Sequence, residues 1–258
     1  MNRISKAFEK NKAFIAFVTG GDPDLDTTEA LIPQMAQAGA DLIEIGIPFS
    51  DPIAEGVVIQ AADERALKAG TTTDKLFDMV RRVRKKTEVP LVFMTYINPI
   101  YTYGAEKFMK RCVECGIDGI IVPDVPFEER EEISAICESA GIKLISMIAP
   151  TSKERICMIA KQAKGFLYCV SSLGVTGVRS QITTNIGEMV QQVKAVSDIP
   201  CAVGFGIATP QQAQEMASCS DGAIVGSAIV KIVAKYGKEC IKPVCDYVQE
   251  MKDAVLSA

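Results

Sequence analysis

The chain has 258 residues and a net charge of -4, and its 48% hydrophobic and 23% charged residues are ordinary for a globular protein. This balance gives no general attraction for nucleic acid, and the longest apolar runs are strand-sized, too short to cross a membrane. The absence of histidine excludes Ser-His and Cys-His nucleophiles and histidine-liganded zinc, so carboxylates, lysine, tyrosine or cysteine must supply any acid–base chemistry.

The N-terminal ten residues resemble a charged helix start and lack the apolar core of a signal peptide. Nine cysteines are scattered through the chain, mostly on apolar faces. Cys112 and Cys115 have CxxC spacing, but they fall on an amphipathic helix and no second pair follows at zinc-ribbon spacing. Free buried thiols in a reducing compartment explain this usage, so we expect a cytoplasmic protein.

Short apolar runs alternate with segments of helical periodicity along the whole chain. Strict alternation of this kind predicts a parallel sheet, and eight units in roughly 250 residues is the size of a (β/α)8 TIM barrel. Because no composition shift marks a boundary, we expect a single barrel domain over residues 1–258. A doubly wound open sheet is the alternative, although no Gly-x-Gly-x-x-Gly follows the first strand. The predicted strands are 13–18, 41–46, 91–96, 119–122, 144–148, 166–171, 201–205 and 223–226, and the clearest helices are 25–38, 106–115, 128–140, 153–163, 188–196 and 211–218.

In such a barrel the site lies at the carboxyl ends of the strands. Two loops there are long enough to suggest lids or binding loops, one from 47 to about 61 after strand two and one from 172 to about 185 after strand six. Glu44 ends an apolar strand, where burial would raise its pKa into the range of a useful proton donor or acceptor. A structural glutamate bonded to a loop amide is equally compatible with Glu44 taken alone.

Glu55 is a second carboxylate, in the first long loop, and could share proton transfer with Glu44 once the loop closes. A solvated loop charge is the alternative, and Asp51 has the same ambiguity or could cap a short helical turn. Phe17, Tyr96 and Tyr168 lie at or near strand ends, as barrel core or as ligand contacts.

Glycines at the last three strand–helix junctions favour a phosphate site, because they let backbone N–H groups approach an anion. Each junction alone is a weak signal. The segments are 174–177, 204–207 with Thr209-Pro210 opening a helix, and 226–228 opening the final helix.

With these residues assembled, the chain closely resembles the tryptophan synthase alpha subunit from about Phe14 to its C-terminal helix. The most specific segments are FVTGGDP (17–23), EIGIPFSDP (44–52), MTYINP (94–99), PDVP (123–126), GVTG (174–177) and GFGI (204–207). The resemblance implies a (β/α)8 barrel that cleaves indole-3-glycerol phosphate by a retro-aldol reaction to indole and glyceraldehyde 3-phosphate.

Site residues follow from the same resemblance. It implies that Glu44 is the acid/base residue. The residues implied to surround the indole and glycerol groups are Phe17, Tyr96, Tyr168 and Thr176. Those implied to hold the phosphate are Gly177, Gly206, Gly226 and Ser227, with Phe205 nearby. It implies no metal or organic cofactor here, because pyridoxal phosphate belongs to a beta subunit that takes up the indole in an alpha2-beta2 heterotetramer. Pro48, Asp51 and Asn98 lie in segments that resemble the beta-contacting face.

One departure concerns Glu55, which stands where the family usually has the aspartate that bonds the indole N–H. The extra methylene moves the carboxylate by roughly 1 Å, and Val57, in place of a usual proline, could relax the loop. Alternative functions are another phosphate-binding barrel enzyme, a weakly active subunit that activates its partner, and a free-standing lyase that releases indole.

Overall fold

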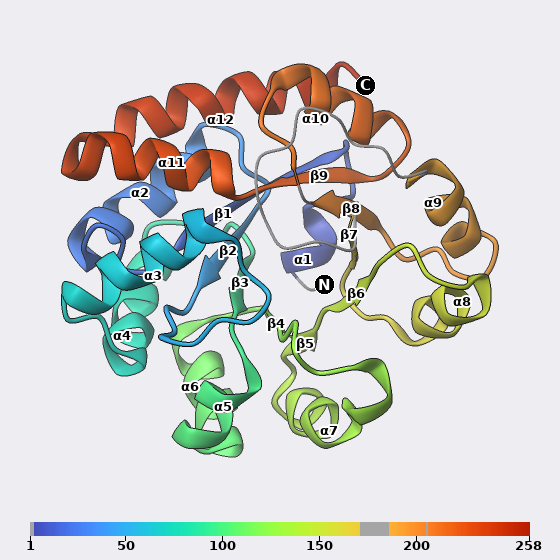
Figure 1. Cartoon of the computed structure of the whole chain (residues 1–258), viewed down its shortest axis with the longest axis horizontal. Helices are drawn as coiled ribbons and strands as arrows, with labels where there is room; N and C mark the ends of the chain where they lie inside the picture. Colours follow the sequence, from blue (N-terminus) through green and yellow to red (C-terminus); the bar gives the residue numbers. More distant parts are fainter. Residues whose placement is uncertain (1–2, 171–185, 205) are drawn as a thin grey trace.

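The computed structural model describes residues 3–170, 186–204 and 206–258. Parallel strands occupy the centre of the described chain and helices surround them (Figure 1). The strands are β1 (Ala13–Thr19), β2 (Leu42–Gly46), β3 (Leu91–Met94), β4 (Gly119–Ile121), β5 (Lys143–Leu144), β6 (Ser146–Ile148), β7 (Leu167–Val170), β8 (Cys201–Gly204) and β9 (Gly222–Val225).

The sheet closes as a barrel of eight β/α units, although the described residues contain nine strand segments. The strand order is β5-β4-β3-β2-β1-β9-β8-β7-β6, and every pairing in it is parallel. β5 and β6 are two parts of the predicted fifth strand and are separated only by Ile145. The first part pairs with β4 and the second with β7, so this one strand changes partners and joins the two ends of the sheet. The TIM-barrel prediction is confirmed.

Each predicted helix is present within a few residues of its expected bounds. The helices are α1 (Arg3–Lys6), α2 (Leu25–Gln37), α3 (Val57–Lys68), α4 (Thr73–Arg84), α5 (Ile97–Tyr103), α6 (Ala105–Cys115), η1 (Phe127–Glu129), α7 (Glu131–Ala140), α8 (Lys153–Gln162), α9 (Ile186–Lys194), α10 (Pro210–Ser218), α11 (Ser227–Tyr236), η2 (Gly237–Glu239) and α12 (Ile241–Leu256). Gly116 and Gly141 end α6 and α7 in the left-handed conformation, which glycine adopts without a steric penalty.

Three details differ from the sequence prediction. The loop after β2 runs only from 47 to 56, because α3 begins at Val57 and not near 61. The predicted helix over 128–140 is divided into η1 and α7. Gly226 opens α11, which is not the final helix, since the chain turns through η2 and continues as α12 against α2 and α10 (Figure 1). The second predicted long loop, 172–185, lies outside the described residues.

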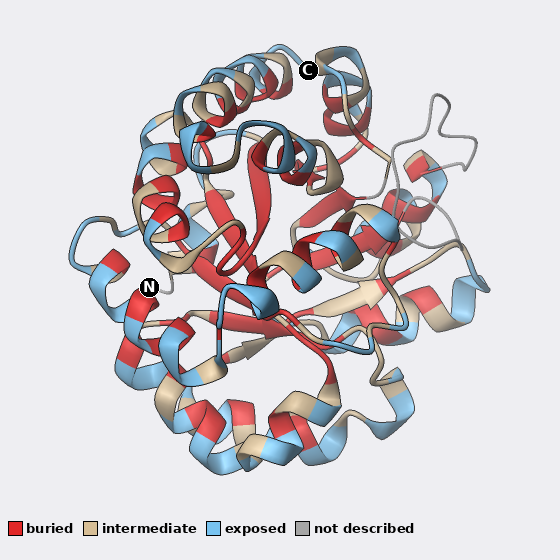
Figure 2. Cartoon of the chain, turned by 60° about the vertical axis from the view of Figure 1, so that its left-hand side comes forward, coloured by how far each residue is buried: buried red, intermediate tan, exposed pale blue. Residues whose placement is uncertain are grey.

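The strands are mostly buried, whereas the surrounding helices carry both buried and exposed residues (Figure 2). Two buried layers result from the alternation of side chains along the strands. Along β2, Ile43 and Ile45 point outward into the apolar layer between sheet and helices, whereas Leu42 points into the barrel interior. Ile4 of α1 joins the interior cluster and fills the end of the barrel where the strands begin.

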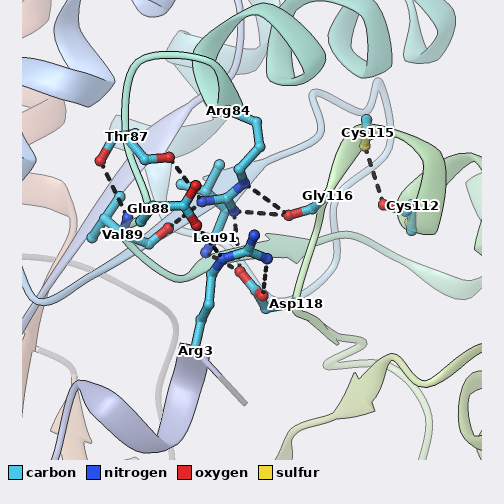
Figure 3. Close-up of polar contacts among 10 residues, drawn as sticks. All are labelled: Arg3, Arg84, Thr87, Glu88, Val89, Leu91, Cys112, Cys115, Gly116 and Asp118. Atoms are coloured by element: carbon cyan, nitrogen blue, oxygen red, sulfur yellow. Dashed lines mark hydrogen bonds and ion pairs between the residues drawn. The ribbon is translucent and has the colours of Figure 1, made fainter. Parts of the chain in front are cut away.

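Ion pairs and hydrogen bonds link the elements at the end of the barrel where the strands begin (Figure 3). Asp118, at the start of β4, accepts hydrogen bonds from Arg3 at 3.1 Å and from Arg84 at 3.1 Å. Arg84 also donates to the backbone oxygens of Gly116 and Val89 at 2.8 and 2.7 Å. The arginines therefore tie α1 and α4 to the strand starts, away from the end where the predicted site lies.

No helix in the described part of the chain is long and apolar enough to cross a membrane. The nine cysteines are free, and Cys112 and Cys115 lie buried on α6 as predicted.

Candidate active site

Glu44 lies inside the barrel, two residues before the carboxyl end of β2. In the strand register it stands beside Phe17 of β1 and Val92 of β3, so its side chain shares their inward face. Its exposure is 0%, and neither carboxyl oxygen has a hydrogen-bond partner among the described residues. The amide-bonded structural role considered from sequence is therefore absent in this part of the chain.

Burial raises the pKa of Glu44 to about 8, because the charged form loses its hydration and gains no hydrogen bond in return. The carboxyl group is therefore protonated at rest near neutral pH. A neutral carboxylic acid in an apolar cavity can donate a proton and, once ionised, take one back.

Two aromatic rings and three glycines shape the space beside Glu44. A Cβ added at Gly46 would lie 2.7 Å from the Phe17 ring, and one at Gly226 would lie 3.4 Å from Phe17. A Cβ at Gly204 would lie 2.4 Å from the Tyr168 hydroxyl oxygen. The rings thus occupy room that larger residues at those strand ends would take. The charge of Glu44 contributes to raising the pKa of Tyr168, after burial itself, which places that phenol near the carboxyl.

Glu55 is held beside the barrel mouth by its neighbours and is not a solvated loop charge. Its carboxyl lies close to the Tyr96 hydroxyl and to the carboxyl of Asp63 on α3, and burial raises its pKa above the ordinary value. Tyr96 precedes α5, accepts a hydrogen bond from the Ala54 N–H at 3.0 Å and packs against Phe49, with ring centroids 5.6 Å apart. The loop after β2 is thereby fixed to the β3–α5 junction.

Asp63 was not identified from the sequence, although a signal for it exists. It belongs to the buried stripe of α3 that also contains Ile59, Ala62 and Ala66, where a carboxylate is out of place. Its exposure is only 4%, and burial together with the charge of Glu55 raises its pKa to about 9.

The predicted phosphate-binding residues are described in part. Gly226 is the N-cap of α11 and Ser227 begins the helix, and no side-chain cap is formed there within the described part of the chain. Gly206 adopts φ 78° just before α10, whose own N-terminus is closed by a capping box from Thr209. Thr176, Gly177 and Phe205 lie outside the described residues.

The predicted partner-contacting residues do not all lie at the surface. Asp51 and Asn98 are exposed, and Asp51 hydrogen-bonds with Ser50 and caps no helix, because α3 begins further along at Val57. Pro48, predicted on the same face, is buried. Ile53 of the same loop and Val57, the first residue of α3, are 75% and 78% exposed, the largest values among the large apolar residues of the described chain.

Groups of three or more histidine, cysteine, aspartate or glutamate residues that could hold a metal ion are absent from the described part of the chain. The geometry is therefore that of a buried acid beside an aromatic-lined space, with a second carboxyl on the covering loop and a helix N-terminus at the same end of the barrel.

Comparison with known proteins agrees with this arrangement. The sequence model of the family "Tryptophan synthase alpha chain" matches residues 4–256. The tryptophan synthase alpha chain of Lacticaseibacillus casei is 45% identical over 255 residues, covering 99% of this chain and 96% of that protein. That of Thermoanaerobacter sp. (strain X514) is 46% identical over 262 residues, covering 99% and 100%.

Solved structures give the same result. Tryptophan synthase subunit alpha from Legionella pneumophila str. Paris superposes with a TM-score of 0.90 at 38% identity, covering 100% of both chains. A chain of the tryptophan synthase complex from Pyrococcus furiosus has a TM-score of 0.85 at 34% identity, covering 94% of this chain and 98% of that one. The chain therefore belongs to the tryptophan synthase alpha chain family, the lyases that cleave indole-3-glycerol phosphate in tryptophan biosynthesis.

Proposed function

We propose that Glu44 is the proton shuttle of the cleavage reaction. The supporting observation is that its carboxyl group is fully buried, unpartnered within the described chain and protonated near neutral pH. A group in that state is prepared to give a proton to the substrate at the start of the reaction, and no neighbouring base among the described residues competes for it.

The proton balance then closes on one residue. Glu44 donates its proton to C3 of the indole ring, which forms the cationic indolenine tautomer. The resulting carboxylate accepts the proton of the hydroxyl group on the adjacent glycerol carbon. As that carbon becomes the aldehyde of glyceraldehyde 3-phosphate, the carbon–carbon bond breaks and its electron pair restores the aromatic indole. Glu44 ends the cycle protonated, as it began.

Glu55 stabilises the positive charge on the ring nitrogen in this proposal. Its Oε2 atom is buried and has no hydrogen-bond partner among the described residues, so it can accept the indole N–H. A carboxylate held in a water-poor site stabilises a developing cation more strongly than it would in water.

The aromatic and phosphate contacts complete the substrate site. Phe17, Tyr96 and Tyr168 would bound the indole, and the uncapped N-terminus of α11 at Gly226 and Ser227 would bind the phosphate, with Gly206 beside it. Thr176, Gly177 and Phe205 remain predictions for the same site. No cofactor is assigned to this chain.

A beta subunit is the proposed partner, because the Pyrococcus furiosus relative is described as part of a tryptophan synthase complex. The exposed apolar pair Ile53 and Val57, together with Asp51 and Asn98, supplies a surface for it. The alpha2-beta2 stoichiometry, pyridoxal phosphate in the partner, transfer of indole between subunits and a cytoplasmic location belong to this proposal.

The decisive experiment measures indole released from indole-3-glycerol phosphate, with and without a beta subunit. We expect wild-type turnover and a loss of about 10²–10⁴-fold in Glu44→Gln, the range that general acid–base catalysis contributes. Exposed Glu64→Gln on α3 is the matched control and should leave turnover unchanged. Near-normal turnover in Glu44→Gln would overturn the assignment.

A further inference from the structure

One wall of the barrel contains a cavity beside β6. The strand that begins as β5 pairs with β4, and after Ile145 it pairs with β7, so in the described sheet β6 has no partner on its β4 side. A cavity of about 230 Å³ lies at this position. Ile145 and Met147, which pack in the interior cluster, line it from one side. Leu144 and Ile148, from the apolar layer beneath the helices, line it from the other. This wall cavity therefore touches both buried layers.

The two helices beside the wall cavity stand apart. α6 packs against α7 and α8 packs against α9, whereas α7 and α8 make little contact with each other (Figure 1). Polar side chains bridge them instead. Arg155 of α8 donates to the Glu128 carboxylate of η1 at 3.0 Å. Arg130, directly before α7, donates to the Gln162 amide oxygen of α8 at 2.6 Å. The wall cavity is therefore bordered by long polar side chains and not by closely packed helices.

Arg130 is the cation of the wall cavity that has no carboxylate partner. Its guanidinium carbon lies 3.9 Å from the centroid of the Phe127 ring. It donates to two neutral oxygens, Ser146 Oγ at 3.3 Å and Gln162 Oε1 at 2.6 Å, and forms no ion pair within the described chain. Arg155, the other cation in the lining, is paired with a carboxylate. Because a guanidinium has five N–H groups, Arg130 keeps donors for an anion.

The lining of the wall cavity favours an anion with an apolar body. Its side chains are apolar except for Arg130, Arg155, Ser146 and Thr151, and no carboxylate is among the described lining residues. Glu131, which follows Arg130, lines the neighbouring outer groove instead. An ammonium group would meet only cations here, so an amino acid would be disfavoured. A cavity of about 150 Å³ holds benzene, so the wall cavity has room for one aromatic ring and a small charged group.

We propose that the wall cavity binds a single-ring aromatic carboxylate, with the ring against Leu144 and Ile159 and the carboxylate on Arg130. The guanidinium fork matches the two carboxylate oxygens, and charge-assisted hydrogen bonds are strong in a poorly hydrated site. The Phe127 ring and the Ser146 hydroxyl hold the guanidinium in place before a ligand arrives, which lowers the cost of ordering it. The described candidate active-site residues do not line this cavity, so the inference is independent of the proposed reaction.

Calorimetric titration of the whole chain with benzoate at pH 7 tests the proposal. We expect one saturable site with a Kd on the order of 1 mM, weak because the ligand is small. Arg130→Gln should weaken binding at least about tenfold, because hydrogen bonds to a charged group contribute about that much. Arg81→Gln on α4, an arginine paired with Asp78 at the surface, is the matched control and should bind as the wild type does. Absence of saturable binding, or an unchanged Kd in Arg130→Gln, would overturn the proposal.

A ligand series makes the same test without any substitution and decides the case if Arg130→Gln does not fold. Acetate keeps the carboxylate and lacks the ring, whereas benzamide keeps the ring and replaces the carboxylate by a neutral amide. Both should bind at least about tenfold more weakly than benzoate. If acetate binds as tightly as benzoate, the site accepts any small anion. If benzamide does so, the charge of Arg130 is not used. Either result removes the proposal.

Ile159→Phe locates the bound ligand. The larger side chain projects from α8 into the wall cavity and should abolish benzoate binding, while indole release from indole-3-glycerol phosphate should remain that of the wild type. Benzoate binding that persists in a folded Ile159→Phe variant would place the ligand elsewhere in the molecule and overturn the assignment.

Discussion

Phe17 and Glu44 are register partners on the neighbouring strands β1 and β2, so an aromatic ring and a carboxyl group project side by side toward the barrel interior. The ring lies between Gly46 and Gly226, and the carboxyl receives no hydrogen bond from the described residues. This neighbourhood keeps water away from the acid and explains its raised pKa. The same ring is available to pack against an indole. The pairing of β1 with β2 therefore fixes the positions of both the ring that would contact the substrate and the carboxyl that would donate the proton.

The stability of wild type relative to Glu44→Gln should fall as pH rises. The pKa of Glu44 in the folded protein, about 8, exceeds the value of 4.5 for a solvent-exposed glutamate, so unfolding releases a proton between these pH values. The free energy of unfolding of the wild type therefore falls with pH across this window, at up to about 1.4 kcal/mol per pH unit, and the penalty stays above pH 8. The glutamine variant lacks this contribution.

Urea denaturation at pH 5 and pH 8 checks this expectation. The variant and the wild type should be similar at pH 5 and diverge at pH 8, while the contribution of Asp63 is common to both proteins and cancels. A stability difference that does not change with pH would contradict burial as the cause of the raised pKa.

Gly46→Ala should displace the Phe17 ring. The new Cβ would lie 2.7 Å from the ring edge, and overpacking of this kind costs about 1–3 kcal/mol. We also expect KM for indole-3-glycerol phosphate to rise, because the ring bounds the proposed indole site. Unfolding free energies and steady-state kinetics measure the two effects.

Phe17→Leu provides the control through a double-mutant cycle. The smaller side chain leaves room for the added methyl group, so Gly46→Ala should cost less in that background. An equal penalty in both backgrounds would show that the backbone of β2, and not the ring, resists the change.

The sequence predicted the barrel because its evidence is local: strand-sized apolar runs, helical periodicity and glycines at helix ends each depend on neighbouring residues. It did not predict the exchange of partners at Ile145, because 144–148 is a continuous apolar run and pairing is a long-range property. The start of α3 at Val57 was also missed, since the last loop residues and the first helical turn share an irregular pattern.

The candidate site also contains residues that the sequence could identify and contacts that it could not. Glu44 was identifiable because a carboxylate within an apolar strand is conspicuous, and in the structure it is fully buried. Glu55 was identifiable only as a loop carboxylate, because its contact with Asp63 depends on how the loop folds back over α3. Pro48 was predicted in a segment that resembles the beta-contacting face, and its side chain is buried, which the sequence of the segment alone does not show.

Asp118→Asn should destabilise the barrel by about 3–5 kcal/mol, because it leaves the largely buried Arg84 without its ion-pair partner. The change lies at the strand starts, so kcat measured well below the melting temperature should be unaffected. Glu88→Gln is the matched control, since Glu88 is exposed and, among the described residues, forms an ion pair only with Arg3, and its removal should scarcely alter the urea midpoint. Equal midpoints for the two variants would show that the buried cluster adds no stability.

Ile53→Lys should weaken association with a beta subunit at least about tenfold, because a central apolar contact of an interface usually contributes more than 1 kcal/mol. Ile53 is 75% exposed on the loop after β2, beside exposed Asp51, and this surface is otherwise hard to explain in a chain whose apolar residues are mostly buried. Val113→Lys on α6 replaces another exposed apolar residue, 49% exposed, and is the matched control. Calorimetric titration with the cognate beta subunit measures both variants. If Val113→Lys weakens binding as much as Ile53→Lys, the loop after β2 is not the docking surface and the effect is one of general charge.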